Sequence, residues 1–366
     1  MNSVLFSPFT LRSLHLANRI VMAPMTRSFS PGGVPGADVA AYYRRRAEGG
    51  IGLIVTEGTY VPHAAAGFDP RVPRLYGAEA LAAWRRVVDE VHAAGGKIFA
   101  QLWHVGMVYG PLRNEPPVGV EPVGPSGLKK PGELTGRPMS QAEIDAVVKA
   151  FGAAASNARQ CGFDGVEIHG AHGYLIDQFS WEGTNRRTDA YGGSVAARMR
   201  FATEIVGEIR RQVGPDFPVA FRFSQWKLQD YTARLASTPE ELEVFLDPLA
   251  RAAVDLFHCS TRRYWEPEFP GSALNLAGWT KKLTGKPTVT VGSVTLDHDF
   301  TKSFATDETA LVTGIDDLLE RLERGEFDLV AIGRSLIVNP AWPAQVKSGG
   351  LSQLRPFHRT ALTQLI

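Results

Sequence analysis

The sequence predicts an α/β fold, a single (β/α)8 TIM barrel, and three observations support this prediction. Eight short apolar runs rich in Val and Ile recur along the chain, and helix-like segments lie between them. Strands that alternate with helices in this way are typical of a barrel of parallel strands. The length of 366 residues also fits, since such barrels often exceed about 250 residues as one domain. We therefore expect one domain over residues 1–366.

The eight apolar runs are the expected strands. Strands of a parallel sheet are buried on both faces, so they read as continuous apolar stretches. The runs are Arg19–Met22, Gly52–Glu57, Lys97–Leu102, Gly165–His169, Pro218–Phe223, Asp255–Ser260, Pro287–Val291 and Asp328–Gly333.

The expected helices lie between these runs, and two of them carry start signals. Ser140-Gln141-Ala142-Glu143 fits a capping box, in which Ser caps the helix and Glu reaches back to it. Thr238-Pro239-Glu240-Glu241 places Pro at the first helical position after a Thr cap. The expected helices are Glu79–Ala94, Ser140–Arg159, Ala196–Gln212, Thr238–Ala253 and Thr313–Arg324.

One stretch, from Tyr109 to Pro138, breaks the alternation because it is dense in Pro and Gly. Proline fixes φ and lacks an N–H, so we expect no regular structure there. The stretch follows the third strand, which predicts a long loop at the C-terminal end of the barrel. An inter-domain linker is the alternative, but neither side holds enough strands for a domain of its own. The seven prolines are Pro111, Pro116, Pro117, Pro122, Pro125, Pro131 and Pro138.

Composition excludes several classes of protein. With 39 Lys and Arg against 38 Asp and Glu, the chain has no basic footprint for nucleic acid or an anionic membrane. Cys161 and Cys259 cannot supply a four-cysteine zinc or iron–sulfur site, and they indicate no disulfide framework. No apolar run is long enough for a transmembrane helix, and the first residues do not resemble a signal peptide. We expect a soluble, cytoplasmic protein without nucleic-acid or membrane partners.

The ends of the last two strands predict a phosphate site. Active sites of such barrels lie at the C-terminal ends of the strands, where Gly292-Ser293 and Gly333-Arg334 fall. Backbone N–H groups can approach an anion closely at glycine, and Arg334 can add a charge-assisted hydrogen bond. Two tight turns with a surface arginine are the alternative interpretation.

His169, His172 and Tyr174 follow the fourth strand. Catalytic zinc usually has three protein ligands, and Glu167 would be a poor third one, so we expect no metal here. Two imidazoles can instead donate hydrogen bonds to one electron-rich oxygen. Tyr174, whose hydroxyl is protonated at neutral pH, can then supply a proton. Histidines that bond backbone carbonyls at a strand end are the alternative.

Gln101, Arg222 and Thr26 also lie at strand ends and can grip a planar heterocycle that has carbonyl and imide edges. A core ion pair is the alternative for Arg222, because a buried arginine needs a partner. A heterocycle beside a phosphate site suggests flavin mononucleotide (FMN). Gly50-Ile51-Gly52 lacks the third glycine of a dinucleotide fingerprint and leads into a strand, so a nicotinamide would bind only transiently.

These residues stand in blocks that resemble the Old Yellow Enzyme family of FMN-dependent ene-reductases. The resemblance covers nearly the whole chain, and Thr26 and Trp103 match the classical branch. The blocks are Asn18-Arg19-Ile20-Val21-Met22-Ala23-Pro24-Met25-Thr26-Arg27, Gln101-Leu102-Trp103-His104, Val166-Glu167-Ile168-His169-Gly170-Ala171-His172-Gly173-Tyr174-Leu175 and Asn185-Arg186-Arg187-Thr188-Asp189-Ala190-Tyr191-Gly192-Gly193-Ser194.

The resemblance implies NAD(P)H as hydride donor and reduction of the C=C bond of enones or enals, with nitro-type compounds as the second acceptor class. In this family hydride passes from flavin N5 to Cβ, and the residue that matches Tyr174 protonates Cα. Non-covalent FMN is expected at Pro24, Met25, Thr26, Gly58, Gln101, Arg222, Gly292, Ser293, Gly333 and Arg334. Substrate is expected at His169, His172, Tyr174, Trp103 and Phe68.

Two segments depart from the family pattern. Phe68 stands where the family often has Tyr, and Ser180-Trp181-Glu182-Gly183-Thr184 is expected to add bulk and charge near the site. Two alternatives belong to other classes of function. One is a non-redox barrel enzyme that uses the phosphate site for its substrate, and the other is a catalytically silent flavin-binding barrel.

Overall fold

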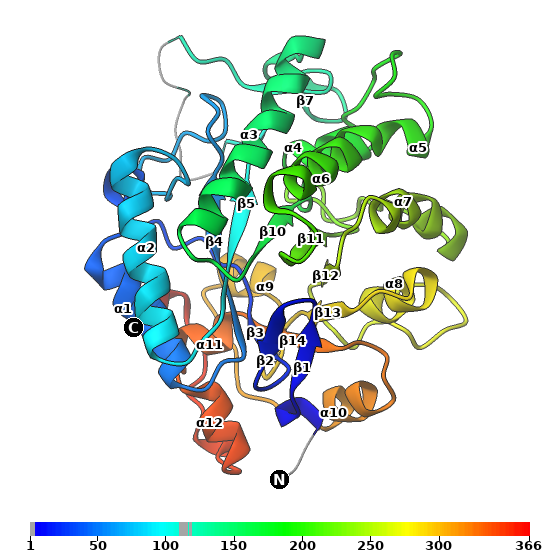
Figure 1. The fold of residues 1–366 in the computed structure, drawn as a ribbon. Helices are drawn as coiled ribbons and strands as arrows, with labels where there is room; N and C mark the ends of the chain where they lie inside the picture. The colour runs from blue at the N-terminus through cyan, green and yellow to red at the C-terminus, as the bar shows by residue number, and fades with distance from the viewer. Residues whose placement is uncertain (1–3, 110–115, 117–118) are drawn as a thin grey trace.

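A closed barrel of eight parallel strands forms the centre of the computed structural model, which describes residues 4–109, 116 and 119–366 (Figure 1). This confirms the predicted fold class. The strands pair in the order β10-β11-β12-β13-β14-β3-β4-β5. Their bounds are β3 (Ile20–Met22), β4 (Leu53–Tyr60), β5 (Ile98–Trp103), β10 (Gly165–His169), β11 (Val219–Phe223), β12 (Leu256–Ser260), β13 (Thr288–Val291) and β14 (Leu329–Ile332).

Each predicted apolar run overlaps one barrel strand, because burial on both faces demands a continuous apolar stretch. The largest difference is in β4, which runs to Tyr60 rather than ending at Glu57. All eight residues of β4 are buried, and its pairing with β5 shifts register between Val55 and Gly58. This irregularity lengthens the strand at the end of the barrel where the site is expected.

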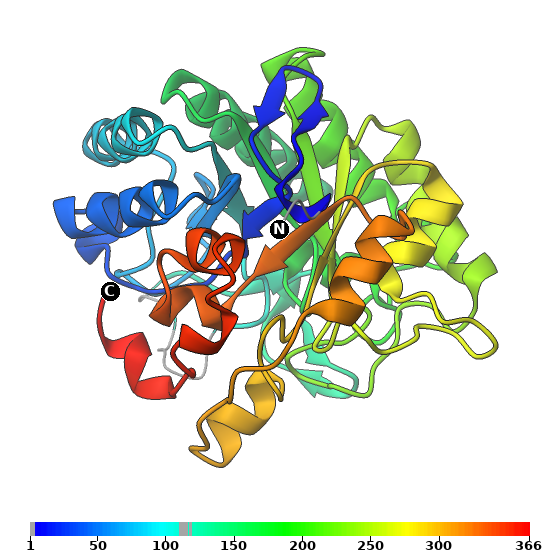
Figure 2. The same cartoon turned by 90° about the horizontal axis from the view of Figure 1, so that it is seen from below.

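Helices surround the barrel, as Figure 2 shows from a second direction. The predicted capping box at Ser140 and the Thr238 cap are both present. The predicted helix 196–212 is divided at Met199 into two. The helices are α1 (Ala37–Glu48), α2 (Ala78–Ala93), α3 (Gln141–Gln160), α4 (Leu175–Ser180), α5 (Val195–Arg198), α6 (Arg200–Val213), α7 (Pro239–Arg251), α8 (Leu276–Thr284), α9 (Phe300–Ala305), α10 (Asp316–Glu323), α11 (Arg334–Val338) and α12 (Trp342–Lys347).

The proline-rich stretch after β5 contains regular structure, so that part of the prediction was wrong. It forms a small parallel sheet of β6 (Val123–Gly124) and β9 (Arg137–Pro138), and a hairpin of β7 (Leu128–Lys130) and β8 (Glu133–Leu134). Pro131 and Pro138 occupy positions that tolerate a missing N–H. Pro131 lies in the hairpin turn before Gly132, whose φ is +79°, and Pro138 ends an edge strand. Residues 110–115 and 117–118, with Pro111 and Pro117, lie outside the described residues.

An N-terminal hairpin closes one end of the barrel. Its strands are β1 (Phe9–Leu11) and β2 (Leu14–Leu16), and Arg12 in its turn pairs with Asp255, the residue before β12. Because this end is filled with leucine side chains, only the opposite end, where the strands terminate, is left for a ligand. The hairpin leucines Leu11, Leu14 and Leu16 form one apolar cluster with the barrel residues Val21, Leu53, Phe99, Ala220, Leu256, Val289, Leu329 and Ala331.

Two further structural findings concern the helices and the thiols. Within the described residues, no helix has the length and apolar character that crossing a bilayer requires. Cys161 and Cys259 are buried and carry free thiols.

A buried ion pair joins the segments that follow β10 and β11. Lys227 Nζ lies 2.7 Å from Asp177 Oδ1, and the two side chains are 0% and 1% exposed. The other carboxylate oxygen of Asp177 accepts a hydrogen bond of 2.7 Å from the Gly173 N–H. The pair therefore ties α4 and the segment after β11 to the turn that carries His172.

We predict that Lys227→Met lowers the free energy of unfolding by about 3–5 kcal/mol, because it leaves the Asp177 carboxylate buried without its partner. Urea denaturation of wild type and variant measures this change. Lys302→Met is the matched control. Its ion pair with Glu308 has the same 2.7 Å separation, but both side chains are about half exposed. Equal unfolding midpoints for Lys227→Met and the control would contradict the prediction.

Candidate active site

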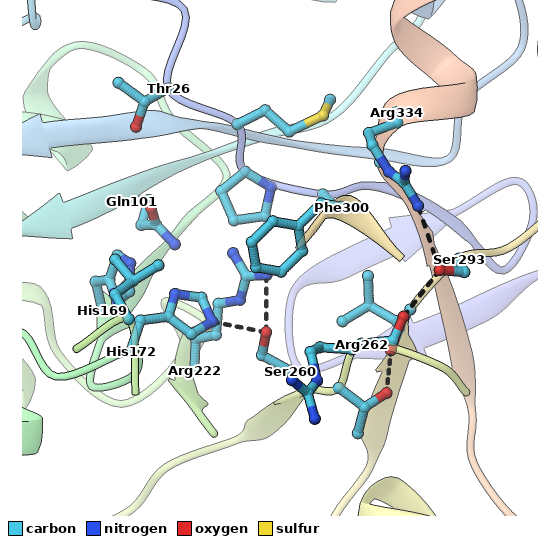
Figure 3. A pocket seen from close by; sticks show the side chains of 18 of the residues that line it. Thr26, Gln101, His169, His172, Arg222, Ser260, Arg262, Ser293, Phe300 and Arg334 are labelled. Carbon is cyan, nitrogen blue, oxygen red and sulfur yellow. Dashed lines mark hydrogen bonds between the residues drawn. The ribbon is translucent and has the colours of Figure 1, made fainter. Parts of the chain in front are cut away.

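A cavity of about 430 Å³ lies at the C-terminal end of the barrel, where residues of β5, β10, β11, β12 and β13 and the segments directly after β3 and β14 line it. Figure 3 shows Gln101, His169, His172 and Arg222 toward one side of this cavity, and Ser293 and Arg334 toward the other. The cavity thus unites the two groups of residues that the sequence predicted. The predicted site residues that line it are Pro24, Met25, Thr26, Gln101, Trp103, His169, His172, Tyr174, Arg222, Gly292, Ser293, Gly333 and Arg334.

Gly58 and Phe68 do not line this cavity. A Cβ atom on Gly58 would come within 2.5 Å of the Trp103 ring, so Gly58 leaves the space in which that indole lies. The Phe68 ring instead lies edge-on to the Tyr109 ring, with the two ring centroids 6.1 Å apart. Trp181 is also away from the cavity: it is buried, and the Lys227 ammonium lies over its ring. The bulk that the sequence predicted near the site at Trp181 therefore does not line the cavity.

Three rings crowd the end of β10. The ring centroids of His169 and His172 are 5.2 Å apart, with the planes nearly perpendicular, and the Tyr174 ring is 4.9 Å from His169. Burial, reinforced by the charge of Arg222, lowers the pKa of both histidines well below its usual range. Burial raises the pKa of Tyr174 above its usual range. At neutral pH the site therefore presents two uncharged imidazoles and a protonated phenol.

The backbone of this turn adopts an unusual conformation. His172 has φ of +66°, which is uncommon for a residue other than glycine, and Gly173 follows with +80°. Hydrogen bonds from neighbouring segments hold the turn in place. The His172 N–H donates to Ser224 Oγ at 3.0 Å, and the His172 carbonyl accepts from the Leu228 N–H at 3.2 Å. Residues after β11 therefore fix the direction in which the His172 side chain leaves the backbone.

Ser260 and Trp226 contact His172 directly, although neither is among the predicted site residues. Ser260 Oγ accepts from Arg222 Nη2 at 3.3 Å and lies 2.8 Å from His172 Nε2. The Trp226 ring stacks on His172 at 4.4 Å, and its Nε1–H donates to the Ser260 carbonyl at 3.1 Å. Ser260 is the last residue of the sixth predicted strand. Because active sites of such barrels lie at the strand ends, this position could have identified Ser260 as a site residue from the sequence.

A row of buried polar groups extends behind the cavity from Gln101. Gln101 Nε2 donates to Glu167 Oε1 at 2.8 Å, and Glu167 Oε2 lies 2.6 Å from His258 Nδ1. Burial alone would raise the pKa of Glu167, but His258, Arg222 and the bond from Gln101 hold it below its usual range. Glu167 thus orients the Gln101 amide, and its hydrogen bonds are to Gln101 and His258 rather than to His169 or His172. Among the described residues, no group of three His, Cys, Asp or Glu side chains is placed to bind a metal.

The other end of the cavity is built for an anion. Arg334 donates to Ser303 Oγ at 2.7 Å and to Ser293 Oγ at 3.3 Å, and burial lowers its pKa to about 10. It forms no ion pair with a carboxylate of the described residues. A Cβ on Gly333 would meet only Met25 Sδ, at 3.8 Å, so bare backbone faces the cavity there. Gly292 has φ of +141°, and a Cβ would strike Thr261 and the neighbouring backbone.

Glu57 supports the segment that follows β3. Its Oε2 accepts hydrogen bonds from the N–H groups of Arg27, at 2.9 Å, and Ser28, at 3.0 Å. These residues come directly after Thr26, so Glu57 fixes the backbone that carries the Pro24–Thr26 lining of the cavity. Complete burial raises the pKa of Glu57 to about 7.

The family model described as NADH:flavin oxidoreductase / NADH oxidase matches residues 4–353 of the chain. The chain belongs to this family. 12-Oxophytodienoate reductase 7 of Oryza sativa subsp. japonica is 37% identical over 92% of this chain and 86% of its own length. 12-Oxophytodienoate reductase 2 of Arabidopsis thaliana is 33% identical, with 93% and 87% covered. The solved structure of morphinone reductase in complex with tetrahydroNAD superposes with a TM-score of 0.79 at 31% identity, covering 100% of this chain and 98% of that one.

These relatives confirm the predicted membership of the Old Yellow Enzyme family. They also confirm the predicted cofactors, FMN and a nicotinamide hydride donor. The enzyme is therefore an FMN-dependent ene-reductase that reduces the C=C bond of unsaturated compounds. These findings favour an oxidoreductase over the alternatives of a non-redox barrel enzyme and a catalytically silent barrel.

We predict that Glu57→Gln flattens the pH dependence of stability between about pH 4.3 and 7. The pKa of Glu57 is about 7 in the folded protein and about 4.3 in an unfolded chain, so the native state binds this proton more tightly. Stability therefore falls as pH rises through this window, by about 4 kcal/mol for Glu57 alone. Urea midpoints of wild type and variant at pH 4 to 8 measure the difference. Parallel profiles would show that Glu57 does not titrate in this range.

Proposed function

We propose that the cavity reduces the C=C bond of α,β-unsaturated carbonyl compounds, on a single FMN-binding domain that spans residues 1–366. One observation carries this proposal. Two neutral imidazoles and a protonated phenol line one end of the cavity. Arg334 lines the other end and forms no ion pair with a carboxylate of the described residues. The relatives named for 12-oxophytodienoate and morphinone support an acceptor of the enone type. A nitro group offers the same kind of oxygen and is the second acceptor class.

The residues of the cavity fit FMN. Arg334, with the backbone of Gly333 and Gly292-Ser293, would bind the phosphate through charge-assisted and N–H hydrogen bonds. Gln101 and Arg222 would bind the edge of the ring. The Arg222 Nε is buried and has no partner in the structure, so it retains a donor for a ligand. Thr26, Pro24 and Met25 lie on the cavity wall and would contact the ring. FMN, when bound, takes hydride from NAD(P)H and delivers it to the acceptor.

The two histidines would bind the acceptor oxygen. The Ala171 N–H donates to His169 Nδ1 at 3.4 Å, which places the ring proton of His169 on Nε2. Arg222 can only donate, so Ser260 accepts from it, and the Ser260 hydroxyl proton is free to bond His172 Nε2. In that arrangement the ring proton of His172 is on Nδ1, where a ligand can accept it. Both imidazoles then present one N–H to the oxygen, where negative charge develops during reduction.

Tyr174 would complete the reduction. With hydride supplied to Cβ of the acceptor, the π electrons would move toward the oxygen that His169 and His172 hold. The Tyr174 hydroxyl would then give its proton to Cα, which converts C=C to CH–CH, and the phenolate would regain a proton from water. Burial keeps this phenol protonated until that step. Trp103, edge-on to Tyr174 at 5.0 Å, fixes the position of the phenol ring.

We predict that Tyr174→Phe slows reduction of cyclohexenone by about 10²- to 10⁴-fold, the usual contribution of a general acid. Reduction of the enzyme by NADPH and reoxidation by a quinone should change little, because neither requires protonation of carbon. Anaerobic stopped-flow absorbance measures each half-reaction separately. Equal slowing of all three reactions, or of none, would show that Tyr174 only packs against the cavity wall.

A further inference from the structure

A second cavity, of about 320 Å³, adjoins the first and lies between the segments that follow β11 and β12. Trp226, Ser260, Thr261 and Arg262 line both cavities. The mechanism above uses only the first cavity. The second is therefore the space into which a molecule longer than the reacting enone would extend.

Aromatic rings line the way from the histidines to this second cavity. Trp226 stacks on His172, and the Tyr231 ring lies 5.7 Å beyond Trp226. Phe300 of α9 completes the group, 5.6 Å from Trp226 and 6.1 Å from Tyr231. Tyr231 is 37% exposed although it is large and apolar. These rings form a wall suited to the apolar body of a ligand.

Three arginines line the second cavity, and two of them are neutralised. Arg234 pairs with Glu268, and Arg263 pairs with Glu266 and Asp299 at 2.7 Å.

Arg262 is different: it forms no ion pair or side-chain hydrogen bond with the described residues. Its guanidinium lies over the Tyr231 ring, 5.6 Å from the centroid. Its backbone is fixed, since the Arg262 carbonyl accepts from Ser293 Oγ at 2.9 Å. One uncompensated, partly buried positive charge thus lies where the two cavities meet. Figure 3 shows Arg262 beside Ser260.

We propose that Arg262, supported by Tyr231, is a subsite for an anionic group, a carboxylate or a phosphate, at the far end of the molecule whose reacting part lies beside His169 and His172. A guanidinium matches the paired oxygens of such groups and binds them through two hydrogen bonds. The anion belongs either to an acceptor with a distal carboxylate or to the 2′-phosphate of NADPH. This inference rests on the proposed position of the acceptor at the histidines.

The test compares Arg262→Gln with Arg262→Lys and wild type, each as the FMN-loaded enzyme. For the acceptor, the probes are a cyclohexenone with a carboxyalkyl side chain and its methyl ester. For the nicotinamide, they are NADPH and NADH. Arg251→Gln is the matched control, because it removes one positive charge from an 80% exposed side chain on α7. Stopped-flow absorbance gives the rate and apparent Kd of each half-reaction.

If the acceptor carries the anion, Arg262→Gln lowers the second-order rate constant for the carboxylate about 10- to 100-fold, and that for the ester less than about threefold. If the nicotinamide cofactor carries the anionic group, Arg262→Gln lowers the second-order rate constant for NADPH about 10- to 100-fold and leaves that for NADH nearly unchanged. Arg262→Lys keeps most of the effect in either case, and Arg251→Gln shows none.

The subsite would be overturned if Arg262→Gln changed the rate constants equally for the carboxylate and its ester and equally for NADPH and NADH. It would also be overturned if Arg262→Gln changed none of these rate constants. Failure of the proposed function looks different. In that case wild type itself would not reduce the neutral ester, whatever happens at Arg262.

Discussion

The left-handed turn at His172 is the constraint on which the rest of the cavity depends. A φ of +66° is unfavourable for a residue with a Cβ, so this conformation persists only because its surroundings hold it. The Lys227–Asp177 ion pair and the bonds from Ser224 and Leu228 supply that support. The turn directs the His172 ring toward Ser260 and places it across from His169. A buried charge pair outside the cavity thus sets the geometry inside it.

Burial then determines the protonation of the cavity. It lowers the pKa of the two histidines and raises the pKa of Tyr174, so the groups at the acceptor end are neutral donors. Positive charge comes from Arg222 and Arg334, which belong to different strand ends, and the Glu167 carboxylate behind Gln101 balances part of it. A site with neutral donors and Arg222 at one end and Arg334 at the other suits a planar cofactor with an anionic tail.

Much of this was predictable from the sequence, and the reason is physical. Strands such as Gly165–His169 are buried on both faces, so they read as apolar runs, and their ends locate the site. Contacts between distant segments were not predictable. Gly58 gives space to Trp103, and no local pattern shows that. Helices of five or six residues, such as α9 and α11, are too short to show a periodic pattern. Phe300, which lies in α9, was therefore not predicted as a cavity residue.

The central claim is that His169 and His172 donate hydrogen bonds to one oxygen of the acceptor, and phenolate binding measures this most directly. A phenolate such as that of p-chlorophenol offers one anionic oxygen and gives a long-wavelength charge-transfer band over oxidised flavin. Titration of wild type, His169→Ala and His172→Ala under equal FMN loading gives three Kd values. We predict that each variant binds about 10- to 100-fold more weakly, the worth of a hydrogen bond to a charged group. An unchanged phenolate Kd in His172→Ala would contradict the account.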